Sequence, residues 1–128
     1  MQRLGKWTIK CSNRAGHGQQ TLAEAVGHSC NPAFIKIGQS LGTEKFYSYL
    51  NAFGFTDSTG IDLPGEGNSV IWDEGNFNTV NLATASFGQR FTVTPVQLIT
   101  AVNAVVNGGY LYTPHVVQSI TNKEGNTV

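Results

Sequence analysis

The chain has 128 residues, and only 12% of them are charged, with eight basic residues balanced by eight acidic ones. That length predicts a single modest domain. The absence of a basic stripe excludes nucleic acid as an expected partner. As written, the sequence holds no signal-peptide region and no apolar run of the roughly 20 residues that span a bilayer, so this segment is expected to make no membrane contact.

The N-terminal half predicts one short strand followed by three closely linked helices. Residues 7–11 are typical of the strand. The helices are expected to begin at a capping box formed by Thr21 and Glu24, at the Asn31–Pro32 pair, and at Thr43. Glycines 42 and 54 are expected to end the second and third helices. Their apolar faces are predicted at Leu22, Ala25 and Val26, at Phe34, Ile37 and Leu41, and at Phe46, Leu50 and Phe53.

The C-terminal half predicts a long irregular stretch, two helical segments and a strand. Residues 54–79 have no period, and a loop of that length is usually functional or wrapped on the surface. Residues 81–87 predict one or two helical turns, and Thr94 with Pro95 begins a second helix by capping box. Its apolar face is predicted at Leu98, Ile99, Val102, Val105 and Val106. Residues 110–120 are typical of a strand. The turn at 122–126 predicts that a partner strand follows, so we expect the sequence to be cut within a domain.

The loop between the first two helices carries the candidate chemistry. Ser29 and Asn31 flank Cys30, and in a turn-like backbone both side chains can lie on one side. A hydroxyl can pass protons and a carboxamide can hold a substrate amide. Two simpler interpretations stay open: Ser29 is an ordinary loop serine, and Asn31 is a helix N-cap before Pro32.

Four motifs in this order resemble the class B penicillin-binding proteins, the D,D-transpeptidases that cross-link peptidoglycan. They are residues 29–34 (Ser-Cys-Asn-Pro-Ala-Phe), 59–66 (Thr-Gly-Ile-Asp-Leu-Pro-Gly-Glu), 94–98 (Thr-Pro-Val-Gln-Leu) and 107–117 (Asn-Gly-Gly-Tyr-Leu-Tyr-Thr-Pro-His-Val-Val). Cys11 after Lys10, and Cys30 within the triplet, are most similar to the sporulation members of the family. The resemblance implies that Ser29 and Asn31 are catalytic: the serine takes part in proton transfer around the nucleophile, and the asparagine holds the amide of the substrate or of a penicillin.

The family's other two motifs, Ser-x-x-Lys and Lys-Thr/Ser-Gly, do not occur. No lysine follows a serine by three positions, and the nearest candidate for the third motif, Lys123-Glu124-Gly125, has a glutamate in the middle. The resemblance therefore implies that residues 1–128 are a partial transpeptidase domain, truncated at both ends. The fold class expected is α+β, a mostly helical subdomain fragment with a C-terminal β-strand, and the chain alone is expected to be inactive.

The two cysteines leave several hypotheses. Cys11 and Cys30 form a possible redox pair, and a disulfide there would constrain Ser29 and Asn31; two unpaired thiols are the alternative. Cys11, His17, His28 and Cys30 include zinc-ligand types, but their intervals match no usual finger spacing, so no metal and no other cofactor is expected. Residues 27–31 also approach the Gly-x-Ser-x-Gly elbow of serine hydrolases, but Asn31 stands where that motif needs glycine.

For the intact parent, the resemblance implies a membrane-anchored enzyme with this domain outside the cytoplasm. Its partners would be the D-Ala-D-Ala stem peptide of peptidoglycan and β-lactams. The alternative is a non-catalytic fold fragment or interaction module that self-associates through apolar surface left uncovered.

Overall fold

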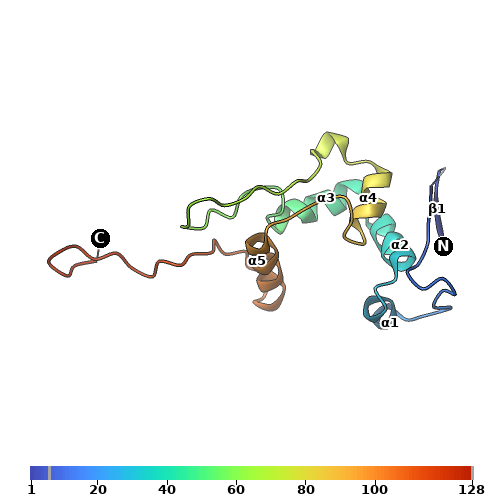
Figure 1. Cartoon of the computed structure of the whole chain (residues 1–128), viewed down its shortest axis with the longest axis horizontal. Helices are drawn as coiled ribbons and strands as arrows, with labels where there is room; N and C mark the ends of the chain where they lie inside the picture. Colours follow the sequence, from blue (N-terminus) through green and yellow to red (C-terminus); the bar gives the residue numbers. More distant parts are fainter. Residues whose placement is uncertain (6, 128) are drawn as a thin grey trace. The chain divides into compact units, whose positions relative to one another are not determined.

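The structure is a computed structural model that describes residues 1–5 and 7–127, and Figure 1 shows the order of its helices and strands along the chain. Its residue contacts divide the chain into two compact units. The first unit holds Met1–Tyr49 and Ile71–Phe91, and the second holds Leu50–Val70 and Thr92–Val128. Each unit is therefore built from two stretches of the chain. Among the described residues, no helix combines the length and the apolar character needed to cross a bilayer.

The first unit begins with a small antiparallel hairpin. Strand β1 (Gln2–Leu4) pairs with β2 (Trp7–Ile9), with Gln2 opposite Ile9. The prediction of a strand from residue 7 is confirmed, but the strand ends at Ile9, so Cys11 lies in the following loop. That loop runs to Thr21 without a helix or strand.

The capping box predicted for the first helix is present. In α1 (Leu22–Gly27), the amide of Glu24 donates to Thr21 Oγ1 at 3.3 Å, and the Glu24 carboxylate accepts from the Thr21 amide at 2.7 Å. The expected apolar face is only partly correct, because Ala25 is buried whereas Leu22 and Val26 are more than half exposed.

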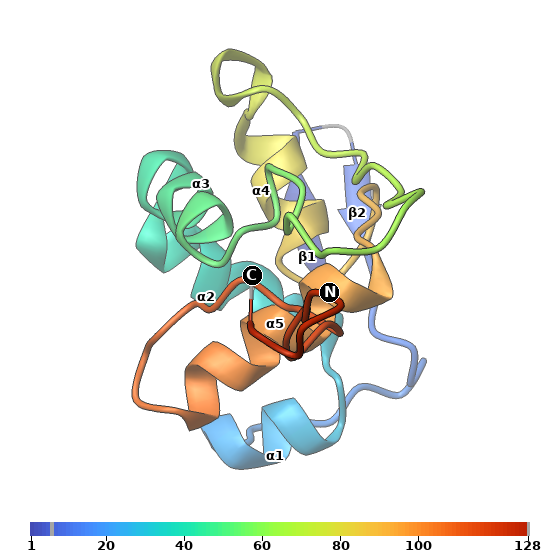
Figure 2. The same ribbon diagram turned by 90° about the vertical axis from the view of Figure 1, so that its left-hand side faces the viewer.

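Helix α2 (Asn31–Leu41) packs on α4 (Thr79–Ala85), and Figures 1 and 2 show the two side by side. The predicted face of α2 is wrong: Ile35 and Gly38 are its buried residues, while Ile37 and Leu41 are exposed. Gly38 explains the choice of face. A Cβ at this position would lie 1.8 Å from Ser86 Oγ, so the close approach of the residues that follow α4 requires a glycine.

Aromatic side chains fill the rest of the first unit. Helix α3 (Thr43–Ala52) contributes Tyr47, whose hydroxyl donates to the Trp72 carbonyl at 3.0 Å. Phe77, which follows the 3-10 turn η1 (Glu74–Asn76), is buried and contacts the rings of Phe46, Tyr47 and Trp72. The predicted apolar face of α3 is partly correct: Leu50 is buried as expected, but Tyr47 is also buried and Phe53 lies beyond the end of the helix.

The second unit is organised around α5 (Pro95–Val106), whose predicted capping box between Thr94 and Gln97 is present. The buried residues of α5 are Gln97, Ala101 and Ala104. The Gln97 amide donates to the Asp57 carbonyl at 2.6 Å, which ties the irregular 54–66 loop to the helix. The predicted apolar face is wrong for this chain, because all five of its residues are at least half exposed.

The predicted strand at residues 110–120 does not form. Within the described part of the second unit these residues run without a paired strand, since an extended segment needs a partner to become a sheet. Asp62 holds the segment instead, accepting from the amides of Val116 and Val117 at 2.8 and 2.7 Å. The predicted turn at 122–126 is present and closes an isolated bridge between Thr121 and Thr127.

Candidate active-site loop

Ser29 lies between α1 and α2 in a backbone conformation that few side chains adopt. Its φ of +47° is in the left-handed region, and its amide donates to the Val26 carbonyl at 3.0 Å as α1 ends. The residue is exposed. A non-glycine residue in this region costs about 1–2 kcal/mol, and residues strained in this way cluster at active sites and ligand-binding sites.

Asn31 is the first residue of α2 and not its cap. The N-cap is Cys30, whose side chain makes no capping hydrogen bond. The interpretation of Asn31 as the N-cap is therefore wrong. The Asn31 carboxamide lies half-buried, and its Nδ2 donates to the Lys10 carbonyl at 3.5 Å, which places the start of the 10–20 loop against the Ser29–Asn31 triplet.

Cys30 is the best-buried member of the triplet, with 6% of its surface exposed. Its amide donates to the Ala25 carbonyl, and its carbonyl accepts from Ala33 and Phe34 in the first turn of α2. Burial opposes ionisation of the thiol, but hydrogen bonds from the Ala33 amide, the Gln20 side chain and Cys11 outweigh it and lower the pKa of Cys30.

The loop that follows β2 brings a second thiol and an imidazole to Cys30. Cys11 Sγ lies 3.3 Å from His17 Nδ1, and the ligand atoms of Cys11, His17 and Cys30 all lie within 4.8 Å of one another. Both cysteines are free in this structure. A pocket of about 390 Å³ opens beside the three groups and is also lined by Gln20 and Lys36.

The two histidines of this region make different polar contacts. The His28 ring stacks on His17 with centroids 4.5 Å apart and planes 7° from parallel, while His28 Nδ1 lies 3.0 Å from Gln20 Oε1. His28 is therefore a neighbour of the thiol cluster and not a member of it. Sequence intervals did not predict that His17 lies beside Cys11 and Cys30, although the glycines on both sides of it indicate a tight turn.

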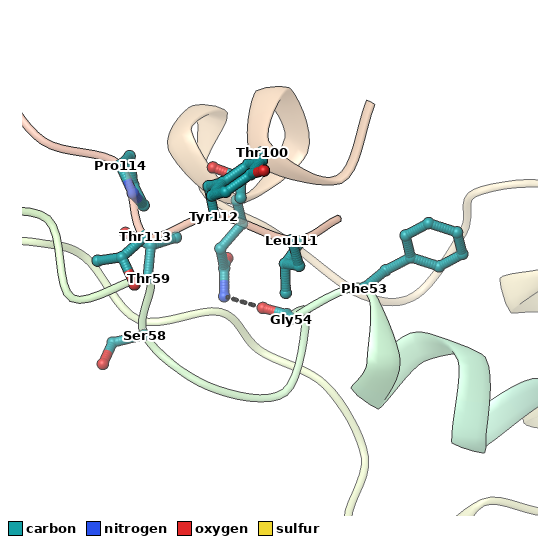
Figure 3. Close-up of a pocket in the computed structure, with 10 residues that line it drawn as sticks. Phe53, Gly54, Ser58, Thr59, Thr100, Leu111, Tyr112, Thr113 and Pro114 are labelled. Carbon is teal, nitrogen blue, oxygen red and sulfur yellow. Dashed lines mark hydrogen bonds between the residues drawn. The ribbon is translucent and has the colours of Figure 1, made fainter. Parts of the chain in front are cut away.

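A different pocket, in the second unit, has no comparable chemistry. It measures about 100 Å³ and lies among the 53–59 loop, Thr100 of α5 and residues 111–114 (Figure 3). None of its lining residues carries a charge at neutral pH. The candidate site therefore remains the loop around Ser29.

The whole sequence matches one family. Residues 1–128 match the family described as penicillin binding protein transpeptidase domain. The chain belongs to this family. The stage V sporulation protein D of Bacillus subtilis is 47% identical over 110 residues, which cover 86% of this chain and 17% of that protein. The peptidoglycan D,D-transpeptidase MrdA of Acinetobacter baumannii is 27% identical over 128 residues, covering 90% of this chain and 18% of that protein.

Solved structures of penicillin-binding proteins share the fold. A peptidoglycan synthetase from Bifidobacterium adolescentis superimposes with a TM-score of 0.88 at 28% identity, over 98% of this chain and 23% of that one. Penicillin binding protein 3 from Mycobacterium tuberculosis, complexed with aztreonam, gives a TM-score of 0.80 at 25% identity, over 84% of this chain and 24% of that one. The complex between PBP2 and MreC from Helicobacter pylori includes a chain with a TM-score of 0.77 at 27% identity, covering 98% of this chain and 24% of that one.

These likenesses confirm the class B penicillin-binding protein family and the α+β fold class, with the small sheet at the N-terminus of this chain. The chain spans less than a fifth of the curated relatives described above.

Proposed function

We propose that this chain is a central segment of a peptidoglycan transpeptidase domain, in which Ser29 and Asn31 form the Ser-x-Asn part of the active site. The observation that carries the proposal is the conformation of the loop: a strained, exposed Ser29 stands two residues before Asn31, the first residue of α2. Family membership supplies the chemistry for which such a loop is suited. Residues 1–128 would then be one part of a domain that continues at both ends.

In the intact parent, a serine of the Ser-x-x-Lys motif attacks the carbonyl carbon between the two D-Ala residues of a stem peptide. The bond to the terminal D-Ala breaks, and this residue leaves as its amine takes up a proton. The amine of a second stem then attacks the acyl-enzyme ester and releases the serine. Ser29 relays protons to and from the nucleophile, and the Asn31 carboxamide holds the substrate amide in register. β-Lactams would acylate the same serine.

The first test is the intact mass of the chain after incubation with penicillin. The 128-residue chain is expected to gain no adduct, because it has no Ser-x-x-Lys motif. A longer form of the parent that carries both flanking motifs is expected to gain one penicilloyl group. A stable one-to-one adduct on the short chain would contradict the proposal and identify a nucleophile within it.

The roles of the two residues are separable in the longer form. Ser29→Ala is expected to slow acylation by about 10²–10⁴-fold, the usual contribution of a proton-transfer group. Asn31→Ala is expected to weaken recognition of the amide and so to raise the concentration of penicillin needed for half-maximal acylation. Ser119→Ala, at an exposed loop serine of the second unit, is the matched control and should acylate as the wild type does.

We further propose that Cys11 and Cys30 are a redox pair that controls the loop, in a parent anchored in the cytoplasmic membrane with this domain outside. The two thiols would lose two protons and two electrons to a disulfide-bearing oxidant, which is reduced to two thiols, and one S–S bond would form. Counting free thiols without and with reductant tests this. Two titratable thiols after exposure to a disulfide oxidant would contradict it.

The second candidate is an interaction module that binds another copy of itself. The exposed apolar residues of α5, among them Ile99, Val102 and Val106, favour it. Sedimentation equilibrium of the chain would then show a dimer, and Val102→Asp would shift it to monomer while Asn103→Asp, at a neighbouring exposed position, would not. A monomer at all concentrations would dismiss this candidate.

A further inference from the structure

The thiol and imidazole groups beside Ser29 form a cluster that proton transfer and substrate binding do not use. Its members come from two places in the sequence: Cys11 and His17 lie in the loop after β2, and Cys30 is the N-cap of α2. Two thiols and one imidazole whose ligand atoms lie within 4.8 Å of one another are a ligand set for a soft or borderline cation.

From this geometry we propose that Cys11, His17 and Cys30 bind a single Zn²⁺ ion, through both sulfurs and His17 Nδ1, with the fourth position open. The proposal does not depend on the transpeptidase role of the loop. It concerns groups that this chain contains in full.

The distances fit the ion. Zn–S bonds of about 2.3 Å and Zn–N bonds of about 2.0–2.1 Å in a tetrahedron place two sulfurs about 3.8 Å apart and a sulfur about 3.5 Å from a nitrogen. Cys11 Sγ and His17 Nδ1 are already 3.3 Å apart, and no pair among the three ligand atoms exceeds 4.8 Å. No distance between two of these ligand atoms therefore has to shorten by more than about 1.3 Å, which side-chain rotation can supply.

The loop is held in shape before any ion arrives. Asn13 Oδ1 accepts from the Ala15 amide at 3.1 Å, and its Nδ2 donates to the Gly16 carbonyl at 3.0 Å, closing the turn that precedes His17. Gly16 and Gly18 have φ values of +78° and +66°, which glycine adopts without strain. The two glycines let the chain reverse on both sides of His17 and so direct its ring toward Cys11.

The net charge of the occupied site and its access through the pocket also suit Zn²⁺. When Zn²⁺ binds, two Zn–S bonds and one Zn–N bond form and the two thiols release their protons, so two thiolates and a neutral imidazole leave the occupied site without net charge. Lys36 in the pocket wall is then not repelled. The pocket of about 390 Å³ gives an entry path and room for a water at the fourth position.

Binding would tie the loop after β2 to the start of α2. Cys30 is adjacent to both Ser29 and Asn31, so the ion would fix the backbone on which both are carried. The same two thiols are required for the proposed disulfide, so the metal and the disulfide exclude each other. Reduced chain would bind Zn²⁺ and oxidised chain would not.

The test uses the reduced, tag-free 128-residue chain and Zn²⁺ or Co²⁺ alone. Titration against a chromophoric chelator is expected to give one Zn²⁺ per chain, and Co²⁺ is expected to give thiolate charge-transfer absorption with the strong visible bands of a tetrahedral site. His17→Ala is expected to lower affinity by more than about 100-fold, because even the loss of an outer partner of a zinc site costs 10–100-fold. His115→Ala, in the second unit, is the matched control and should bind as the wild type does.

A second measurement uses only the wild-type chain, so its result does not depend on whether the His17→Ala variant folds. Saturating Zn²⁺ is expected to protect both Cys11 and Cys30 from alkylation, read by mass spectrometry, and a chelator should restore their reactivity. Equal alkylation rates with and without Zn²⁺ would overturn the proposal, as would undiminished Zn²⁺ affinity in His17→Ala. Either result would mean that the three residues are not a zinc site and that Cys11 and His17 only share a hydrogen bond.

Discussion

At the scale of single residues, the backbone conformation of Ser29 lowers stability, whereas the role proposed for its hydroxyl requires a serine at this position. Its φ of +47° is of a kind that glycine adopts freely and that other L-residues adopt at a cost of about 1–2 kcal/mol. Arg90 is the other non-glycine residue with positive φ among those described. A serine stands at position 29 although glycine would fit the backbone better, which is expected if the hydroxyl has the proposed role in proton transfer.

Ser29→Gly is therefore expected to stabilise the chain while removing the hydroxyl. The released strain exceeds the entropy that an added glycine loses on folding, so the free energy of unfolding should rise by up to about 1 kcal/mol. Urea denaturation followed by circular dichroism measures this. Ser119→Gly, a loop serine without positive φ, is the control and should lower stability by about 0.5–1 kcal/mol. Equal shifts in the two variants would show that Ser29 is not strained.

At the scale of elements, the helix termini marked by a capping box or a glycine were predictable, whereas the start of α4 at Thr79 and the buried faces of the helices were not. The capping boxes at Thr21 and Thr94 and the glycine at 42 are local signals, and each acts where the sequence placed it. A buried face depends on the partner that packs there. The period of α2 pointed to Ile37 and Leu41, but Ile35 and Gly38 are the buried residues of the helix. At Gly38 the missing side chain permits the close approach of Leu82 and Ser86.

Gly38→Ala tests that packing. Alanine favours a helix by about 1 kcal/mol over glycine, but its Cβ would lie 1.8 Å from Ser86 Oγ and displace a hydroxyl that donates to the Leu82 carbonyl. Overpacking of this kind costs about 1–3 kcal/mol, so a net loss of up to about 2 kcal/mol is expected.

The matched variant is Gly27→Ala, at a helical glycine whose added Cβ meets nothing within 4 Å. It should leave stability unchanged or raise it by up to about 1 kcal/mol. Thermal denaturation of the two variants side by side gives the comparison. If Gly38→Ala melted as high as Gly27→Ala, the contact between α2 and the end of α4 would be wrong.

At the scale of the whole chain, only some of the residues of the candidate site could be predicted from the sequence. Ser29, Cys30 and Asn31 are consecutive, so a motif was enough to find them. The joining of Cys11 and His17 to Cys30 depends on how the loop after β2 returns to α2, and no spacing rule encodes that return. Likewise, residues 110–120 have the composition of a strand, but a strand forms only when it pairs with a second segment. The composition of residues 110–120 does not show whether such a segment is present.

The chain as a whole is expected to lose stability in acid through three carboxylates. Hydrogen bonds from the backbone and side chain of Thr21 lower the pKa of Glu24, amides of Val116 and Val117 lower the pKa of Asp62, and the side chain and backbone of Thr59 lower the pKa of Glu66. Each folded pKa lies below the ordinary value of 4.5 for Glu or 3.8 for Asp. The stabilisation is therefore complete above the unfolded pKa and is lost as pH falls through the folded pKa.

Thermal denaturation between neutral pH and strong acid measures this loss in both units. The melting temperature of the wild type should fall as the pH falls into the acid range. Asp62→Asn should melt at a lower temperature than the wild type at neutral pH, because the amides of Val116 and Val117 lose a charged acceptor. For the same reason its melting temperature should depend less steeply on pH in acid. Asp73→Asn, at an exposed aspartate of the first unit, controls for the change in net charge and should keep the wild-type slope. If Asp62→Asn kept that slope as well, the carboxylate would not be what holds residues 116–117, and the segment would have to be fixed by its apolar contacts.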